Sequence, residues 1–371
     1  MLLEAVDVAV IGGGPAGCAA ALALRTHFPE LCVAMVEAGD YTEYRSGEIL
    51  PPAARSLLRG LGVLHLRDER VAKPSCGVAS AWGSEQLEEN SYFYSPNGGG
   101  WHLDRNAFDA RLAEECEGRG ATVMRRTALC EAVRDGETWQ LQTRHGTISA
   151  RFAIDATGRM AALARMQGAL VLLQDRQMAY SRVYENAGEC ATETIVESAQ
   201  HGWWYTAPLP EGRRMASFMT DGDLGRELGL PEVAAWDLLL DQTVHTRAAI
   251  GESAPPITDC LVRCSATARL DRVCGEGWLA TGDACAAYDP LSAQGITKAL
   301  RNGTISAYAA GDVLRGGEPN GIAKYAAILE CQFSNYGRAH RAYLARETRW
   351  SNGPFWARRQ GELLSTSGGG K

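Results

Sequence analysis

The chain has 371 residues, of which 46% are hydrophobic and 22% charged, as is ordinary for a globular protein of one large or two closely joined domains. The formal net charge of −7 argues against a nucleic-acid-binding surface. No apolar run is long enough to cross a membrane, and the N-terminus lacks the features of a secretory signal. Eleven cysteines without a C-x-x-C pair predict reduced thiols and no metal site, so we expect a cytoplasmic protein.

The N-terminal part of the chain carries the strongest motif. An apolar run is followed by Gly12, Gly14 and Gly17, which fill the G-x-G-x-x-G positions before an alanine- and leucine-rich helix. The first glycine allows a tight turn, the second lets the backbone approach a pyrophosphate, and the third lets helix and strand pack closely. A second strand ends at Glu37, which is suited to accept a hydrogen bond from an adenosine ribose hydroxyl. The pattern predicts a dinucleotide site made by Gly12, Gly14, Pro15, Ala16, Gly17 and Glu37.

The next hundred or so residues have weaker signals. Residues 40–60 predict a loop followed by a short helix, and the glycine-punctuated residues 61–100 are expected to be irregular. A helix is predicted over 106–118, with Asn106 as its N-cap and Asp109 at the third helical position.

The remaining pattern predicts two interleaved sheets. Four strands forming a β-meander are expected between 121 and 154, and the last runs into Asp155 and a glycine turn that would let the backbone pass close to a cofactor. Alternating polar and apolar stretches from about 165 to 255 predict an inserted antiparallel sheet, with a helix over 231–246. A buried strand then ends at Asp283. We therefore expect an α/β fold with the divisions 1–165 (first part of a nucleotide-binding domain), 166–255 (inserted substrate domain), 256–320 (second part) and 321–371 (C-terminal helical region and flexible tail).

Three separated motifs together resemble the FAD-binding fold of p-hydroxybenzoate hydroxylase-type flavoproteins. This group includes flavin monooxygenases, flavin-dependent halogenases and geranylgeranyl reductases. The motifs are the N-terminal glycines, the strand end at Asp155 and the stretch 282–296. The resemblance implies a Rossmann-type FAD-binding domain in which Asp283 binds the ribityl chain and Arg105 contacts the cofactor. A helix starting near Gln294 would point its N-terminus at the flavin edge where charge collects on reduction. Along the isoalloxazine the resemblance places Pro290, Leu291, Gly295 and Ile296.

Within this group, residues 202–208 resemble the Gly-Trp-x-Trp-x-Ile-Pro signature of tryptophan halogenases. Tyr205 stands where the signature has its second tryptophan, and Ala207 stands where it has isoleucine. Halogenases also need a lysine that captures hypohalous acid. Lys73 lies at a comparable distance along the chain, but its neighbours do not resemble that motif.

A closer resemblance is to the LodB-like group, flavoproteins that mature the tryptophan-derived quinone cofactor of a partner amino-acid oxidase. The stretches that carry it are 47–52, 80–84, 100–105 and 289–296, together with the compact length. The resemblance implies an FAD-dependent monooxygenase that hydroxylates a protein-bound tryptophan through a flavin C4a-hydroperoxide, a step toward a tryptophylquinone such as cysteine tryptophylquinone. Its partners would be the oxidase precursor, molecular oxygen, and NAD(P)H or an external flavin reductase.

Several residues are candidates for work at the flavin, each with a structural alternative. Trp203 and Trp204 could form an aromatic wall around an indole or could be core of the second sheet. His102 could move protons near the flavin or act as a structural hydrogen-bonding group. Glu48 could face the flavin or the substrate, or serve as a capping or surface carboxylate. Arg45 could bind the adenosine phosphate or pair with a neighbouring glutamate.

Two other functions stand beside the first. The protein could hydroxylate or halogenate a free small aromatic such as tryptophan, which would require a closed pocket. Alternatively, it could be a flavin-stabilised chaperone without catalytic activity that holds a precursor for self-processing.

Overall fold

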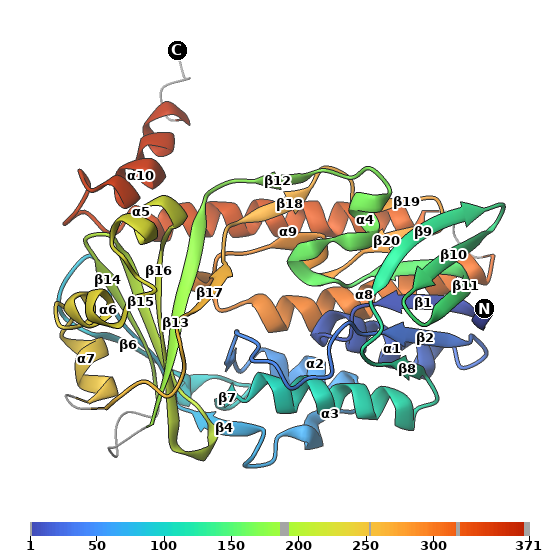
Figure 1. The fold of residues 1–371 in the computed structure, drawn as a ribbon, viewed down its shortest axis with the longest axis horizontal. Helices are drawn as coiled ribbons and strands as arrows, with labels where there is room; N and C mark the ends of the chain where they lie inside the picture. Colours follow the sequence, from blue (N-terminus) through green and yellow to red (C-terminus); the bar gives the residue numbers. More distant parts are fainter. Residues whose placement is uncertain (1, 186–192, 252–253, 317–319, 367–371) are drawn as a thin grey trace.

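The structure, a computed structural model, describes residues 2–185, 193–251, 254–316 and 320–366. Two large sheets lie toward opposite ends of the long axis, and helices α3 (Arg105–Gly118), α8 (Gly295–Leu314) and α9 (Gly321–Leu344) run between them (Figure 1). Among these residues, none of the helices combines the length and the apolar character needed to cross a bilayer. The tail expected to be flexible lies largely outside the described residues.

An eight-stranded sheet contains the predicted N-terminal strand, β1, at its centre. β1 pairs in parallel with β2 and β11, and β11 pairs in parallel with β20. The register aligns Ile11 with Val36 and Asp155, and aligns Asp155 with Ala280, so four strands end together at one edge of the sheet. The strand order is β19 (Cys274–Gly275), β20 (Trp278–Ala280), β11 (Gly146–Asp155), β1 (Leu2–Ile11), β2 (Val33–Val36) and β8 (Thr122–Met124), with β10 (Thr138–Thr143) on β11 and β9 (Leu129–Asp135) on β10.

Helix α1 (Pro15–His27) follows the glycine motif and is buried along its whole first part. Its residues from Pro15 to Leu24 are all buried, and most of them are alanine or leucine. These small side chains allow α1 to pack closely against α8, and α1 also contacts α3. The predicted helix, strand and glycine turn of the dinucleotide motif are thereby confirmed.

The second sheet has seven strands and extends beyond the segment 166–255. The expected antiparallel strands are present as β13 to β16, but β5 and β6 join them from the region expected to be irregular. β14 pairs in parallel with β5, which ties this sheet to the N-terminal half of the chain. The order is β17 (Leu261–Cys264), β13 (Gln177–Glu185), β16 (Arg213–Asp221), β15 (Gly202–Pro208), β14 (Thr194–Ala199), β5 (Gly77–Ala81) and β6 (Glu88–Ser91).

Two small sheets and several short helices complete the fold. In one sheet, β7 (Gly100–Leu103) lies between β3 (Ile49–Leu50) and β4 (Ala72–Ser75), and in the other β18 (Ala268–Leu270) lies between β12 (Val171–Leu173) and β21 (Ala286–Ala287). The short helices are α2 (Ala54–Gly60), α4 (Ala162–Met166), α5 (Gly222–Glu227), α6 (Val233–Leu240), α7 (His245–Ile250) and α10 (Pro354–Thr366).

Four local predictions are wrong. Residues 61–100 are not irregular, because they supply three short strands whose polar residues and prolines hide the pattern. The first strand of the expected meander, β8, instead pairs in parallel with β2. The helix expected over 231–246 is divided into α6 and α7. Helix α3 is capped by Asp104, whose carboxylate accepts from the Ala107 backbone N–H, and not by Asn106.

Candidate functional site

The three motif glycines lie at the sheet edge where the parallel strands end. Gly12 has φ +108°, and a Cβ there would lie 2.3 Å from the Ala156 carbonyl oxygen. A Cβ on Gly17 would lie 1.9 Å from the Gly12 carbonyl oxygen. Around Gly14, at the start of α1, a Cβ would meet no protein atom within 4 Å. The turn is therefore tight at its two ends and open at its middle, where free N–H groups of the helix can meet a pyrophosphate.

Glu37, at the end of β2, is fixed by the protein's own hydrogen bonds. One carboxylate oxygen accepts from the Gly13 N–H at 2.7 Å, and the other accepts from the Gly39 N–H and from Arg45 Nη2, both at 2.8 Å. Glu37 is 7% exposed. Each carboxylate oxygen can accept two hydrogen bonds, so the oxygen bound to Gly13 has room for one more donor, such as a ribose hydroxyl.

Arg45 and Arg105 meet on the fully buried Asp109. Arg105 Nη2 lies 3.0 Å and Arg45 Nη1 lies 3.3 Å from the same carboxylate oxygen. Arg105 also donates to the carbonyl oxygen of Ser46 at 2.7 Å. Asp109, expected as a helix-capping residue, is instead a buried anchor that draws α3 and the loop before Glu48 together. Arg45 therefore pairs with Glu37 and with Asp109, and Arg105 pairs with Asp109 beside it.

Asp283 follows β20 at the same sheet edge and lies beside two cations. Its Oδ1 accepts from Lys298 Nζ at 2.7 Å, and its Oδ2 lies 3.9 Å from Arg159 Nε. Burial alone would raise the pKa of Asp283, but the charges of Lys298 and Arg159 outweigh it and lower the pKa. The Asp283 side chain keeps 34% exposure, so it remains open to a ligand hydroxyl while ionised.

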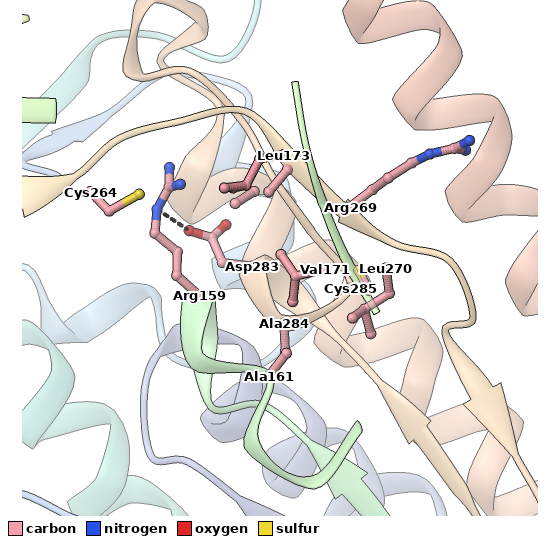
Figure 2. A pocket seen from close by; sticks show the side chains of 12 residues that line it. Arg159, Ala161, Val171, Leu173, Cys264, Arg269, Leu270, Asp283, Ala284 and Cys285 are labelled. Atoms are coloured by element: carbon pink, nitrogen blue, oxygen red, sulfur yellow. Dashed lines mark ion pairs between the residues drawn. The ribbon is translucent and has the colours of Figure 1, made fainter. Parts of the chain in front are cut away.

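A pocket with about 350 Å³ of open space adjoins Asp283. Figure 2 shows Asp283 and Arg159 directed toward one another at this pocket, with the Cys264 side chain beside the guanidinium. The wall opposite is apolar and includes Val171 and Leu173 of β12.

Asp155 has a different place from the one expected. It is fully buried, and its carboxylate accepts from the backbone N–H groups of Thr157 at 3.0 Å and Ala164 at 2.8 Å. Burial raises its pKa above the ordinary value. The side chain therefore shapes the turn after β11 and caps α4, and only the backbone beside it reaches the sheet edge where a cofactor would lie.

The segment expected along the isoalloxazine is held by helix α9. Asp289 is 1% exposed; its Oδ1 accepts from the Leu291 N–H and its Oδ2 lies 2.9 Å from His340 Nε2. The Tyr336 hydroxyl accepts from the Asp289 N–H at 2.9 Å, and its ring stacks on Tyr288 with centroids 4.0 Å apart. These contacts fix the 3₁₀ turn Pro290–Ser292 immediately before α8.

Helix α8 begins next to this turn, as expected for a helix starting near Gln294. A Cβ on Gly295 would meet no protein atom within 4 Å, so the N-terminus of α8 is open. Ile296, in contrast, is 5% exposed and packs in the main core. Pro290 and Gly295 are therefore exposed on the segment predicted to lie along the flavin, whereas the Ile296 side chain is core.

Glu48 lies at the centre of a buried polar cluster with two tyrosines. Its carboxylate accepts from the Tyr44 hydroxyl at 2.6 Å and from the Tyr205 hydroxyl at 3.1 Å. Glu48 is 3% exposed, and burial raises its pKa. Burial next to Glu48 also raises the pKa of Tyr44 and of Tyr205 well above their ordinary values. The cluster joins the loop after β2 to strand β15 and can hold or pass a proton.

The two predicted tryptophans lie on opposite faces of β15. Trp204 is 0% exposed and packs between Phe218 and Trp236, away from the FAD-binding edge. Trp203 is 1% exposed and packs with Trp82 on the face that also carries Tyr205. Both side chains are core, so neither lines an open wall. The partly buried hydrophobic residues that pack against the Trp203 cluster include Tyr44, Ile49 and Leu291.

His102 lies on β7 with its ring fully buried. Its Nε2 is 2.8 Å from the Thr194 hydroxyl of β14, so it joins the small sheet to the second sheet. Burial, with added repulsion from Arg214 and Lys73, lowers its pKa to about 3. His102 is therefore neutral near pH 7 and acts as a structural hydrogen-bonding group and not as a proton carrier.

These observations fit an extended FAD. Gly14 and Asp283 follow β1 and β20, whose ends are aligned at one sheet edge, and Lys298 holds the first turn of α8 against Asp283. They would accommodate pyrophosphate, ribityl chain and flavin ring in that order. The ten cysteines among the described residues form no disulfide, and those residues contain no cluster of side chains suited to a metal ion.

Comparison with known proteins identifies the family. The profile of the tryptophan halogenase family matches residues 7–73 and 78–222, more than half of the chain. The chain belongs to this family. It is therefore an FAD-dependent oxidoreductase, and the predicted FAD cofactor is confirmed.

Among individual relatives, LodB of Marinomonas mediterranea, a putative FAD-dependent oxidoreductase, is 29% identical over 96% of this chain and 97% of its own. Among solved structures, the myxobacterial chondrochloren halogenase CndH has a TM-score of 0.86 at 19% identity, over 98% of this chain and 88% of its own. The peptidyl tryptophan dihydroxylase QhpG, essential for tryptophylquinone cofactor biogenesis, has a TM-score of 0.72 at 24% identity, over 96% and 78%. These structures confirm the predicted fold, including the antiparallel second sheet.

Several site residues were missed by sequence reasoning. Lys298 and Arg159 act on Asp283, and Tyr336 and His340 act on the segment before α8. The spacing of Tyr336 and His340, one helical turn apart on α9, was the available signal. Lys298 had none, because a lysine inside a helix normally predicts a solvated face.

Proposed function

We propose that this protein is an FAD-dependent monooxygenase that hydroxylates a tryptophan residue of a partner protein, during formation of a tryptophylquinone cofactor in an amino-acid oxidase. The observation that carries the proposal is the match to LodB, which extends over 96% of this chain and 97% of the relative. The dihydroxylase QhpG, with the same fold, supports the choice of a peptidyl tryptophan as substrate.

The chain's own residues have distinct tasks in this proposal. Gly14, Glu37 and Asp283 bind the cofactor, and Asp289 orients the segment along the flavin ring. Bound FAD would supply the activation of oxygen. Glu48 lies where the loop after β2 meets β15, and its hydrogen bonds to Tyr44 and Tyr205 hold it in place. With its pKa raised by burial, Glu48 can donate or accept a proton as an indole is hydroxylated.

The direct test is mass spectrometry of the partner. An amino-acid oxidase precursor from the same organism is expressed with the wild-type protein, without it, or with a Gly14→Ala variant designed to lose FAD. We expect added oxygen on one tryptophan only with the wild-type protein, and labelled oxygen when labelled dioxygen is supplied. A tryptophan that is oxygenated equally without this chain would reject the proposal.

Halogenation is the second candidate, favoured by the family and by the place of one lysine. The chain has lysines at 73, 298, 324 and 371. Lys298 is occupied by Asp283, whereas Lys73 is the cross-strand neighbour of His102, on the side of the small sheet that meets β14. A Lys73→Met variant discriminates: it would abolish bromination of an indole in bromide buffer if the protein is a halogenase, and would leave hydroxylation intact under the first proposal.

A further inference from the structure

One surface segment exposes aromatic side chains beside the candidate site. The short 3₁₀ helix Tyr92–Tyr94 directly follows β6. Phe93 is 84% exposed and Tyr94 is 87% exposed, and their rings meet edge to face with centroids 5.2 Å apart. Fully hydrated aromatic pairs of this kind are uncommon on a folded surface unless something covers them.

The third aromatic residue of this segment is turned inward. A Cβ on Gly100 would lie 2.9 Å from the Tyr92 ring, so Tyr92 packs directly on the start of β7. Burial and the Glu48 carboxylate raise the pKa of Tyr205, and the nearby Tyr92 hydroxyl raises it further. Tyr92 thus links the exposed pair to the Glu48 cluster over a short distance.

The strand before this segment has an open edge. β6 (Glu88–Ser91) is the last strand of the second sheet; it pairs with β5 on one side, and no described strand pairs with its other side. All four of its residues are exposed. Unpaired backbone groups of an edge strand can accept an added strand from another chain.

The charge of the β6 edge determines which strands of another chain would bind there favourably. Glu85, Glu88 and Glu89 are all exposed, and only Glu88 among them has an ion-pair partner in the described structure, Arg346. The edge is therefore acidic, which favours a segment with lysine or arginine and disfavours one with acidic residues.

We propose that the edge of β6, together with Phe93 and Tyr94, is the docking surface for an extended, basic segment of the protein that carries the tryptophan to be modified. The inference rests on the proposed function. The added strand would pair with β6, and its apolar side chains would pack on the aromatic pair. Strands β14, β5 and β6 would lie between the added strand and β15, which carries Tyr205, so four strand spacings, or about 19 Å, separate the added strand from β15. About six extended residues cover that distance, so the modified tryptophan lies about six residues or more from the docked segment.

The test uses a synthetic peptide with one tryptophan and alternating threonine and lysine on both sides, and an analogue with glutamate in place of lysine. We expect the holoenzyme to bind the lysine peptide more tightly and to protect the β6 backbone amides from hydrogen exchange. A Phe93→Ser/Tyr94→Ser variant and a Glu89→Lys variant should each weaken this binding about tenfold. Matched controls on exposed residues elsewhere, Leu238→Ser and Glu131→Lys, should not.

Turnover on the oxidase precursor separates this inference from the proposed function. The Phe93→Ser/Tyr94→Ser variant should raise KM and leave kcat and the visible spectrum of bound FAD unchanged. Unchanged KM with normal hydroxylation would overturn the docking surface and leave the function standing. Failure of the wild-type protein to hydroxylate the precursor, with peptide binding that still depends on Phe93 and Tyr94, would overturn the function and leave the surface standing. Equal binding of both peptides to the wild-type protein and the variants would overturn the surface.

Discussion

The structure predicts that Gly14→Ala separates FAD binding from folding. Gly14 has φ −77° and ψ −176°, which alanine adopts freely, and an added methyl group would meet no protein atom within 4 Å. The stability change should therefore stay within about 1 kcal/mol. The same methyl group would occupy the space through which a pyrophosphate reaches the α1 N–H groups. Loss of one charge-assisted hydrogen bond, about 1.5–3 kcal/mol, corresponds to roughly 10- to 150-fold weaker FAD binding.

Gly17→Ala is the matched control for this prediction. Its Cβ would lie 1.9 Å from the Gly12 carbonyl oxygen, so the helix or the turn must move, at a cost of about 1–3 kcal/mol or more in folding free energy. Fluorescence titration with FAD and thermal melting without FAD distinguish the two variants. We expect Gly14→Ala to melt like the wild-type protein and to bind FAD weakly, and Gly17→Ala to lose both properties. A Gly14→Ala protein that binds FAD with wild-type affinity would refute the placement of the pyrophosphate at α1.

Three further predictions concern buried charges. Lys298→Met removes the main partner of Asp283. Because the Asp283 carboxylate is partly exposed to water, the free energy of unfolding should fall by only about 1–3 kcal/mol. Denaturant titration measures this change. The wild-type protein should lose stability as pH rises through the raised pKa of Glu48, because the buried carboxyl group then ionises. The Glu48→Gln variant is neutral at every pH and should not show this loss. Melting temperature measured against pH compares the two proteins. Hydrogen bonds from Arg349 and Ser198 outweigh burial and lower the pKa of Glu347 to about 2. The stabilising contribution of Glu347 is therefore full above its unfolded pKa and is lost as pH falls toward 2. In an acid titration, the free energy of unfolding of the Glu347→Gln variant should lack up to about 3 kcal/mol of this pH dependence.

The fold was predictable where local pattern and long-range pairing agree. The glycine turn, the buried strand before it and the alanine-rich helix after it are specified by adjacent residues, and the structure has them as predicted. The boundary of the second sheet was not predictable in the same way. β5 joins that sheet through a parallel pairing with β14, more than a hundred residues later, and no local feature of residues 77–81 announces it. β6 is polar throughout, because an edge strand exposed on both faces lacks the alternation that marks a half-buried strand.

In the candidate site, the direction of a side chain and its partners from distant elements could not be predicted from the sequence. Gly12 and Gly14 were predicted because a pyrophosphate-binding turn needs glycines at fixed spacings, and Asp283 was predicted from the family resemblance. Asp155 and Trp204 belong to other predicted motifs, and both side chains turn into the protein, since residue type does not reveal the direction in which a side chain points. Lys298 and His340 were missed because their partners become neighbours only when α8 and α9 pack against the sheet edge.

Three acidic side chains at this sheet edge are each held in place by a basic side chain before FAD binds. Glu37 is held by Arg45, Asp283 by Lys298, and Asp289 by His340, and each acid follows a strand or precedes a turn along the proposed path of the cofactor. In each pair the partner comes later in the chain: Arg45 lies in the loop after β2, Lys298 on α8 and His340 on α9. The cost of fixing the three acids is therefore met during folding and not during binding, which leaves more of the contact energy with FAD to appear as affinity.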